Sequence, residues 1–577
     1  MAGFRAPGIR ITEKDISEVI VPSGSSVGAL VGPAYQGPTN QRILNTTNKE
    51  FFQTFGTPTS GVSSEFGYYA ADEFLQQSGF MWFVRTTTSD DKVGTVEYTG
   101  TATASAAVFS EGSTADVLAA PGFEDGNKLD NYYPMETSAN AAGGITIGAN
   151  SCGEWSSNIG ISIVTSASST TTSAVGFDYG YNWEGKYPST HEYYRINVYS
   201  KLDKTSDVEA GWVTGTSAIS AVVPEESYIV SNSELAKDFE GNSLYVKDVI
   251  NGFSPTIYAV PGSDTTFLNK DWAAQGISSL IEGISTINMA SVATGWDLFA
   301  NRDAVSPDIL IAPYDSTSTN TTAKNALIAA ANTASTRRDC MAIVNVGSKV
   351  DKPTAIAAAK GAISAYNSSY VAIYGGWDLI FDSFSGKNVY IPKSIFGAAG
   401  IAKNDSLGQP WTAPAGLSRG VLTSSLGQYK IFNENEIGFM YNSNVNTSKR
   451  VRGAGDVMWG QKTGQTKASA TDRINVRRLL NYIEKSIEPG LLAYMFEGNT
   501  EKLRSRVDNN LTSFLRTVQA GEGLASFQVV VDETNNTAQV IDNNELAIDI
   551  YVQPVRTIEY INVQVIITRT GVSFAEV

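Results

Sequence analysis

The stretch that decides the fold runs DILIAP (308–313), TAKNALIAAANTASTRR (322–338), MAIVNVG (341–347), PTAIAAAKGAISAYN (353–367) and YVAIYGGW (370–377). Its short apolar runs are typical of strands buried on both faces, and the segments between them have helical spacing. Strands that alternate with helices along a chain indicate a largely parallel sheet covered by helices. This stretch therefore predicts a central α/β domain.

The beginning of the chain shows the same pattern. The apolar strand VGALVGPAYQGP (27–38) is followed by helical segments at 48–56 and 64–79, and then by the buried strand FMWFVRT (80–86). From about residue 88 to 260 the chain changes to short alternating strands such as ISIVTSAS (161–168), separated by Gly, Ser, Thr and Asn. We interpret this region as one or two β domains inserted into the α/β unit, because surface loops tolerate insertions.

After the insertion, DWAAQGISSLIEGIS (271–285) is predicted to form a helix that leads back into the α/β domain. Beyond about residue 400 the pattern becomes α+β. The helix NVRRLLNYIEKSI (475–487) has one apolar face, which consists of Val476, Leu479, Leu480, Ile483 and Ile487. Two alternating strands are expected near the end, broken at Pro554; their apolar residues are Leu546, Ile548, Ile550 and Val552, then Ile561, Val563, Val565 and Ile567.

The fold class that follows is a multidomain α/β and α+β protein. It has a central, largely parallel α/β sheet domain, a β-rich inserted outer part and a C-terminal α+β domain. At 577 residues the chain is too long for one hydrophobic core. The expected segments are an N-terminal extended arm (1–20), the first part of the α/β domain (21–88) and the inserted β-rich part (89–260). The second part of the α/β domain (261–400) and the C-terminal domain (401–577) follow.

Composition argues against several classes of function. The net charge of −16 makes free nucleic acid an unexpected main partner. No apolar run approaches the ~20 residues of a membrane span, and the N-terminus lacks a signal-peptide core, so we expect synthesis in the cytoplasm and no membrane insertion. Cys152 and Cys340 are interpreted as small buried residues.

Catalytic chemistry has little support. His191 is the only histidine, so a Ser-His-Asp triad would have to include it. Two separated cysteines do not form a structural zinc site, and no phosphate-binding glycine motif is present. We expect no enzyme activity, no catalytic residues, no metal and no cofactor.

One helix carries an unusual charge pattern. EKLRSRVDNNLTSFLRTV (501–518) is predicted to begin after an N-cap at Thr500. Its apolar face consists of Leu503, Val507, Leu511, Phe514, Leu515 and Val518. The opposite stripe consists of Lys502, Arg506, Asn509, Ser513 and Arg516, with three cations and no acid. This stripe is either an ordinary solvated face or a docking surface for an acidic partner.

Several segments resemble, in their order, the motifs of tail sheath proteins of contractile bacteriophages. They are APGI (6–9), ALVGPAYQGP (29–38), RRDCMAIVNV (337–346), SSYVAIYGGWDLIFD (368–382), IPKSIFGAAGIAKNDSLGQPWTAPAG (391–416), NVRRLLNYIEKSI (475–487), FEGN (496–499), FQVVVDETNNT (527–537) and IDNNELAIDIYVQPVRTIEYI (541–561). GEWSSNIGISI (153–163) is similar to the family's Gly-x-Trp-Gly-Asn element, with Ser157 in place of glycine. The resemblance covers 1–90 and 330–577 and is weak over 90–260.

The resemblance implies a non-enzymatic subunit that forms stacked sixfold rings around an inner tail tube and contracts to drive the tube through the host envelope. Its implied partners are further copies of itself, the tube protein, and the baseplate and tail terminator proteins. The location is the virion tail, after assembly in the host cytoplasm. Strand exchange between subunits would involve Ile9, Ile11, Ile561, Val563, Val565 and Ile567, and the stripe on 501–518 would contact the tube.

Two alternatives remain open at this point. One is the sheath of a phage-derived contractile injection system. The other is a carbohydrate-binding protein or hydrolase whose site lies in 90–260, where Trp155, Trp183 and Trp212 could line a sugar groove.

Overall fold

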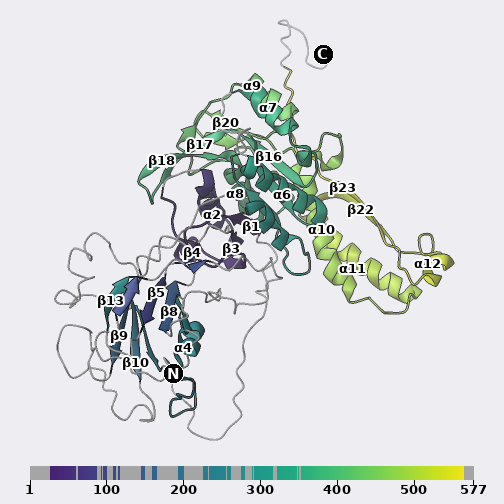
Figure 1. The fold of residues 1–577 in the computed structure, drawn as a ribbon. Helices are drawn as coiled ribbons and strands as arrows, with labels where there is room; N and C mark the ends of the chain where they lie inside the picture. Colours follow the sequence, from purple (N-terminus) through teal and green to yellow (C-terminus); the bar gives the residue numbers. More distant parts are fainter. Residues whose placement is uncertain are drawn as a thin grey trace, which may run out of the picture.

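Figure 1 shows the computed structural model of the chain. The structure describes residues 26–59, 63–86, 92–93, 95–99, 108–111, 115–116, 144–149, 159–165, 193–199, 225–231, 233–254, 256–261, 275–279, 289, 291–315, 321–346, 349, 352–407 and 409–564. Of the residues singled out above, Ile9, Ile11, Cys152, Trp155, Ser157, Trp183, His191, Trp212, Val565 and Ile567 lie outside these ranges.

A six-stranded sheet forms the centre of the molecule, with the strand order β16-β15-β14-β1-β3-β2. Its strands are β1 (Val27–Gly32), β2 (Arg42–Asn45), β3 (Phe80–Arg85), β14 (Ile309–Ala312), β15 (Met341–Val346) and β16 (Val371–Gly375). All neighbours in this sheet pair in parallel except β2, which pairs antiparallel with β3. The predicted parallel α/β sheet is confirmed.

Helices cover both faces of this sheet and create two cores. One core contains residues of α1 (Asn48–Phe55), α2 (Phe66–Leu75) and α8 (Lys393–Ser406), with the short helix η1 (Ser63–Glu65) leading into α2. The other contains α5 (Val292–Gly295), η6 (Trp296–Phe299), α6 (Thr321–Arg337), α7 (Pro353–Gly361) and η7 (Ser364–Tyr366). Burial on both faces explains why β1, β14 and β15 read as continuous apolar runs.

Two glycines in β1 allow this close packing. A Cβ on Gly28 would lie 2.6 Å from the Phe74 ring, and one on Gly32 would lie 2.2 Å from the Tyr314 hydroxyl. A larger side chain at either position would push a helix or the neighbouring strand away from the sheet.

The inserted region forms separate antiparallel sheets, which lie below the central sheet in Figure 1. The strand orders are β11-β10-β9-β13, β12-β8-β5-β6 and β4-β7. The elements are β4 (Lys92–Val93), β5 (Thr95–Thr99), β6 (Val108–Glu111), β7 (Ala115–Asp116), β8 (Gly144–Ala149), β9 (Gly160–Thr165), β10 (Tyr194–Tyr199), β11 (Glu226–Val230), α4 (Val246–Phe253), β12 (Ile257–Pro261) and β13 (Gln275–Ser279).

The predicted helix at 271–285 is wrong for its described residues. Gln275–Ser279 is strand β13, which pairs antiparallel with β9. The segment contains Gly276, Ser278 and Ser279, all weak helix formers, so pairing with a distant strand decides its conformation. The next strand of the central sheet is β14, which begins at Ile309, later than the predicted return near residue 261.

The C-terminal third has two parts. Next to the central sheet lie β17 (Trp377–Asp382), β18 (Lys387–Pro392), β19 (Gly427–Gln428), α9 (Glu434–Asn442), β20 (Ser448–Val451), β21 (Gly455–Met458) and η8 (Ala470–Asp472). Beyond them follow α10 (Ile474–Leu492), α11 (Glu501–Ala520), β22 (Leu524–Val530), α12 (Ala538–Asp542) and β23 (Asp549–Pro554). In Figure 1 this second part extends from one side of the molecule, with α12 at its far end.

Candidate assembly interface

Helix α10 joins the projecting C-terminal part to the rest of the molecule. Its N-terminal half is buried, and Arg478 forms an ion pair with Asp405 at the end of α8. Further along, Lys485 Nζ lies 2.8 Å from Asp308 Oδ1, and the other oxygen of Asp308 accepts a hydrogen bond from Val27 N at the start of β1. These contacts, two helical turns apart on the same side of α10, fix the helix against the α/β domain.

A two-stranded antiparallel ribbon, β22–β23, packs beside α10 and α11. Val529 pairs with Ile550 and Phe527 pairs with Val552. Leu479, Ile483, Leu515, Val518 and Leu524 form a small core beneath the ribbon. Because this sheet has two strands, each has one edge without a neighbour among the described residues, and such edges are templates for a further strand.

An apolar groove lies between α10 and the ribbon, with a volume of about 510 Å³. It is lined by Leu480, Ile483, Glu484, Ile487, Glu488, Leu491, Leu492, Met495, Ile550 and Val552. Leu492 and Met495 are 64% and 60% exposed. An apolar cleft of this size beside a free strand edge indicates a surface that is covered in an assembly.

Residues 555–564, which follow the ribbon, lie outside any strand. Ile561 and Val563, predicted to lie in a terminal strand, are 80% and 79% exposed and belong to no helix or strand in the described part of the chain. Glu559 holds this segment against the body through Arg473, with a separation of 2.6 Å. Burial alone would raise the pKa of Glu559, but hydrogen bonds from Arg473 and Gln461 outweigh it and lower that pKa.

The second predicted strand is therefore not formed over its described residues, which end at 564. Only β23 of the two expected strands is present, and it begins at Asp549, after Leu546 and Ile548. A strand with a free apolar face and no hydrogen-bonding neighbour is not stable alone in water, which explains the difference.

Helix α11 agrees with the sequence prediction. Thr500 Oγ1 caps it by accepting a hydrogen bond from Leu503 N, and the apolar face is buried except for half-buried Phe514. All five residues of the polar stripe, Lys502, Arg506, Asn509, Ser513 and Arg516, are exposed. The three cations of this stripe form no ion pair with the described part of the chain. Arg504, near the apolar face, is buried and donates to Asn499 Oδ1 at 2.9 Å.

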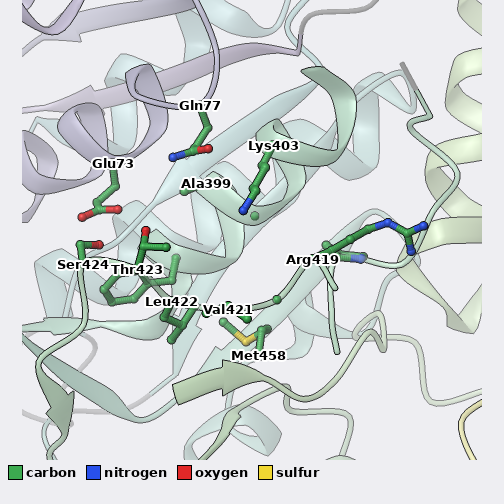
Figure 2. A pocket seen from close by; sticks show the side chains of 14 residues that line it. Glu73, Gln77, Ala399, Lys403, Arg419, Val421, Leu422, Thr423, Ser424 and Met458 are labelled. Carbon is green, nitrogen blue, oxygen red and sulfur yellow. The ribbon is translucent and has the colours of Figure 1, made fainter. Parts of the chain in front are cut away.

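A second, small pocket lies between α2, α8 and the loop before β19, and Figure 2 shows Glu73, Gln77 and Lys403 around it. Its volume is about 30 Å³, enough for about one water and far below the ~300 Å³ of ordinary ligand sites. Burial raises the pKa of Glu73. No substrate of ordinary size fits this pocket.

The described residues contain no group of three His, Cys, Asp or Glu side chains placed to hold a metal ion. None of the described helices is both long and apolar enough to cross a bilayer. Cys340 is buried, in agreement with its interpretation from sequence.

Sequence reasoning missed the groove. Leu491, Leu492, Met495 and Phe496 follow Pro489 and Gly490, where a helix is expected to end. The feature of the sequence that could have indicated the groove is the apolar run LLAYMF (491–496), which follows the expected helix end. In the structure Phe496 of this run is fully exposed and has a positive φ of 67°.

Comparison with known proteins agrees with this geometry. Residues 466–568, which include α10, α11 and the ribbon, match the family model of the phage tail sheath C-terminal domain. The tail sheath protein of Enterobacteria phage T4 is 25% identical over 665 aligned positions, covering 99% of this chain and 98% of the T4 protein. The tail sheath protein of Vibrio phage KVP40 is 29% identical over 377 positions, 61% of this chain and 55% of that protein.

The fold is also similar to a solved structure. The crystal structure of the sheath tail protein from Desulfitobacterium hafniense has a TM-score of 0.51 at 10% identity, covering 96% of this chain and 98% of that one. The chain is therefore similar over nearly its whole length to a phage tail sheath protein, and residues 466–568 match the phage tail sheath C-terminal domain.

Proposed function

We propose that this chain is the structural subunit of a contractile phage tail sheath. It polymerises in stacked sixfold rings around an inner tube and contracts to drive the tube through the host envelope. The observation that carries this proposal is the full-length similarity to the T4 tail sheath protein. The subunit acts through its surfaces rather than through a catalytic pocket, and its location is the virion tail, after assembly in the host cytoplasm.

Subunits are held together by strand exchange at the C-terminal part. The free edges of β22–β23 and the apolar groove beside α10 are suited to accept added strands from neighbouring copies. The donated strands come from the N-terminal arm, with Ile9 and Ile11, and from the C-terminal segment, with Ile561, Val563, Val565 and Ile567. Main-chain hydrogen bonds would supply affinity and the groove would accept alternate side chains.

The stripe on α11 contacts the tail tube. Its three exposed cations stand out in a chain of net charge −16. Each exposed ion pair contributes only about 0–1 kcal/mol, so many such contacts hold an extended sheath and still release row by row. The ends of the sheath would meet the baseplate and tail terminator proteins.

Electron microscopy of the purified chain at increasing concentration tests the proposal. Hollow striated tubes with sixfold end views are the expected result. Persistent monomers that also fail to assemble on the isolated tube and baseplate would refute it.

Matched variants test the groove. Leu492→Asp, in the groove, is expected to abolish tubes while leaving a folded subunit. Leu407→Asp is its control, because Leu407 is 65% exposed, close to the 64% of Leu492, and lies outside the groove. Deletion of residues 1–20 is expected to have the same effect as Leu492→Asp. Tubes of normal length from either variant would exclude strand exchange at this groove.

The tube contact has its own test. Lys502→Glu, Arg506→Glu and Arg516→Glu together are expected to leave self-assembly intact but to weaken co-sedimentation with the tube protein. The control changes charge equally at three exposed lysines elsewhere, Lys237, Lys247 and Lys467. Equal tube binding by the two triple variants would rule out the α11 stripe.

A further inference from the structure

The segment that follows the ribbon is held against the body of the subunit mainly through Glu559. Arg473 donates to this carboxylate with two nitrogens, from Nε to Oε1 at 2.6 Å and from Nη2 to Oε2 at 3.0 Å. Gln461 Nε2 donates to the same Oε1 at 3.1 Å, and also to Thr557 Oγ1. A planar guanidinium that binds both oxygens of a carboxylate fixes its orientation as well as its position.

A tyrosine completes this carboxylate site. Tyr441, near the C-terminal end of α9, also forms a hydrogen bond with Glu559. Burial and the nearby Glu559 carboxylate raise the pKa of the Tyr441 hydroxyl, which therefore stays protonated and donates. Only 18% of the Glu559 side chain is exposed. We call Glu559 together with its three donors, Arg473, Gln461 and Tyr441, the Glu559 clasp.

The donors of the Glu559 clasp are fixed by the body of the subunit itself. Lys462 and Arg473 form an antiparallel bridge, and Ile474 N donates to Gln461 O at 2.8 Å. Lys462 Nζ lies 4.4 Å from the centroid of the Tyr441 ring. Gln461 is 4% exposed. Donors that are already fixed lose little conformational freedom when they bind a carboxylate.

The contacts of the segment with the body end at Glu559. Thr557 and Glu559 both contact Gln461, whereas Ile558 and Tyr560 are 82% and 74% exposed. This alternation is typical of extended backbone. Residues 560–564 form no hydrogen bond or ion pair with the rest of the described chain. The Glu559 clasp therefore divides the segment into a part that the body holds and a part that it does not hold.

We propose that the Glu559 clasp anchors the donated C-terminal strand. It fixes the place, beside α9 in Figure 1, at which this strand leaves its own subunit, and it sets the hinge of the strand directly after residue 559. The inference rests on the strand exchange in the proposed function and adds the side chain that positions the donated strand. A segment that is already anchored has fewer residues to order when it joins a neighbouring copy.

Glu559→Gln tests the anchor, because it keeps the size of the side chain and removes the charge that Arg473 binds. The first measurement is digestion with trypsin below the concentration at which tubes form, with release of residues 557–577 followed by mass spectrometry. Arg556 is exposed and lies between the ribbon and Glu559, so its cleavage reports how often this stretch detaches from the body. Cleavage after Arg556 is expected to be about tenfold faster in Glu559→Gln.

The second measurement is the critical concentration for tube formation. It is expected to rise about tenfold in Glu559→Gln, because the detached segment then has to be ordered during assembly. Tyr441→Phe removes one donor and keeps the ring beside Lys462, so it should change both measurements in the same direction by a smaller factor. Glu545→Gln is the control, since it makes the same chemical change at an exposed glutamate outside the clasp, and should alter neither.

Three results would overturn the anchor. They are unchanged cleavage in Glu559→Gln, faster cleavage with an unchanged critical concentration, and effects of equal size in Glu545→Gln. A lower critical concentration in Glu559→Gln would also overturn it, because the clasp would then hold the segment back from assembly. In each of these cases the unaltered chain still forms tubes, so the proposed function stands. An unaltered chain that forms no tubes on its own or on the tube and baseplate refutes that function, and the anchor with it.

Discussion

Replacing Arg478 by methionine removes one half of a buried ion pair that connects α10 to α8. Arg478 and Asp405 are 7% and 6% exposed, and Arg478 Nη1 lies 2.6 Å from Asp405 Oδ1. The same nitrogen also donates to Pro410 O at 3.2 Å. In the variant, the Asp405 carboxylate stays buried and loses its ion-pair partner.

The expected cost follows from this geometry. Removing one partner of a buried ion pair destabilises by about 3–5 kcal/mol, because the remaining charge is desolvated and unpaired. At 1.4 kcal/mol per factor of ten, backbone amides of α10 should exchange hydrogen on the order of 100- to 1000-fold faster. Replacing both residues, Arg478→Met with Asp405→Leu, should restore most of the protection because no charge remains buried.

Hydrogen exchange followed by mass spectrometry of α10 peptides measures this directly and avoids assuming two-state unfolding of a 577-residue chain. Arg516→Met, on the exposed stripe of α11, is the control and should leave α10 unchanged. If Arg478→Met accelerates exchange less than about fivefold, or if the double replacement is no better than the single one, the ion pair does not hold α10 in place.

The effect should also depend on pH. Burial raises the pKa of Asp405 from 3.8 to about 6, against the opposing influence of Arg478. A carboxyl whose pKa is higher in the folded state than in the unfolded state contributes stability that is fully present below pH 3.8 and is lost as the pH rises through about 6. The difference between Arg478→Met and the unaltered chain should therefore be smaller at pH 5 than at pH 8, after correction for intrinsic exchange rates.

Three further changes have defined outcomes. Gly464→Ala should lower the stability of the folded chain by about 1–3 kcal/mol or more, because the added Cβ would lie 1.8 Å from Tyr366 O. Thermal denaturation measures this, and an unchanged midpoint temperature would show that the site has room. Thr500→Ala should cost about 1 kcal/mol and speed exchange in the first turn of α11, while Thr517→Ala near its end should leave that turn unaffected. Cys340 should resist alkylation in the native chain at pH 8 and react after denaturation, as read by mass spectrometry of its peptide, because burial raises its pKa to about 12.

The central sheet was the most predictable part of the fold. The strands β14 and β15 and the helix α6 were predicted within one or two residues, because each combines a complete apolar run or helical repeat with local end signals. The N-cap and faces of α11 were predicted for the same reason. These features depend on residues within about one turn or one strand of each other.

The features that sequence reasoning missed depend on distant partners. β13 is a strand because it pairs with β9, more than 100 residues earlier in the chain. The Arg478–Asp405 pair joins residues 73 positions apart, and neither residue is unusual where it stands in the sequence. Periodicity within a short window contains no information about either contact.

The assembly surface adds a third case, in which the partner lies outside the chain. The pattern of Ile561 and Val563 is that of a half-buried strand, yet both are exposed because no described residue of the subunit covers them. The groove beside α10 is the complementary case, since its apolar walls are covered by no strand within the described ranges. A subunit that polymerises is expected to carry apolar side chains in a pattern typical of buried strands, which the subunit alone leaves exposed. The mismatch between the two therefore locates the sites where neighbouring copies are expected to bind.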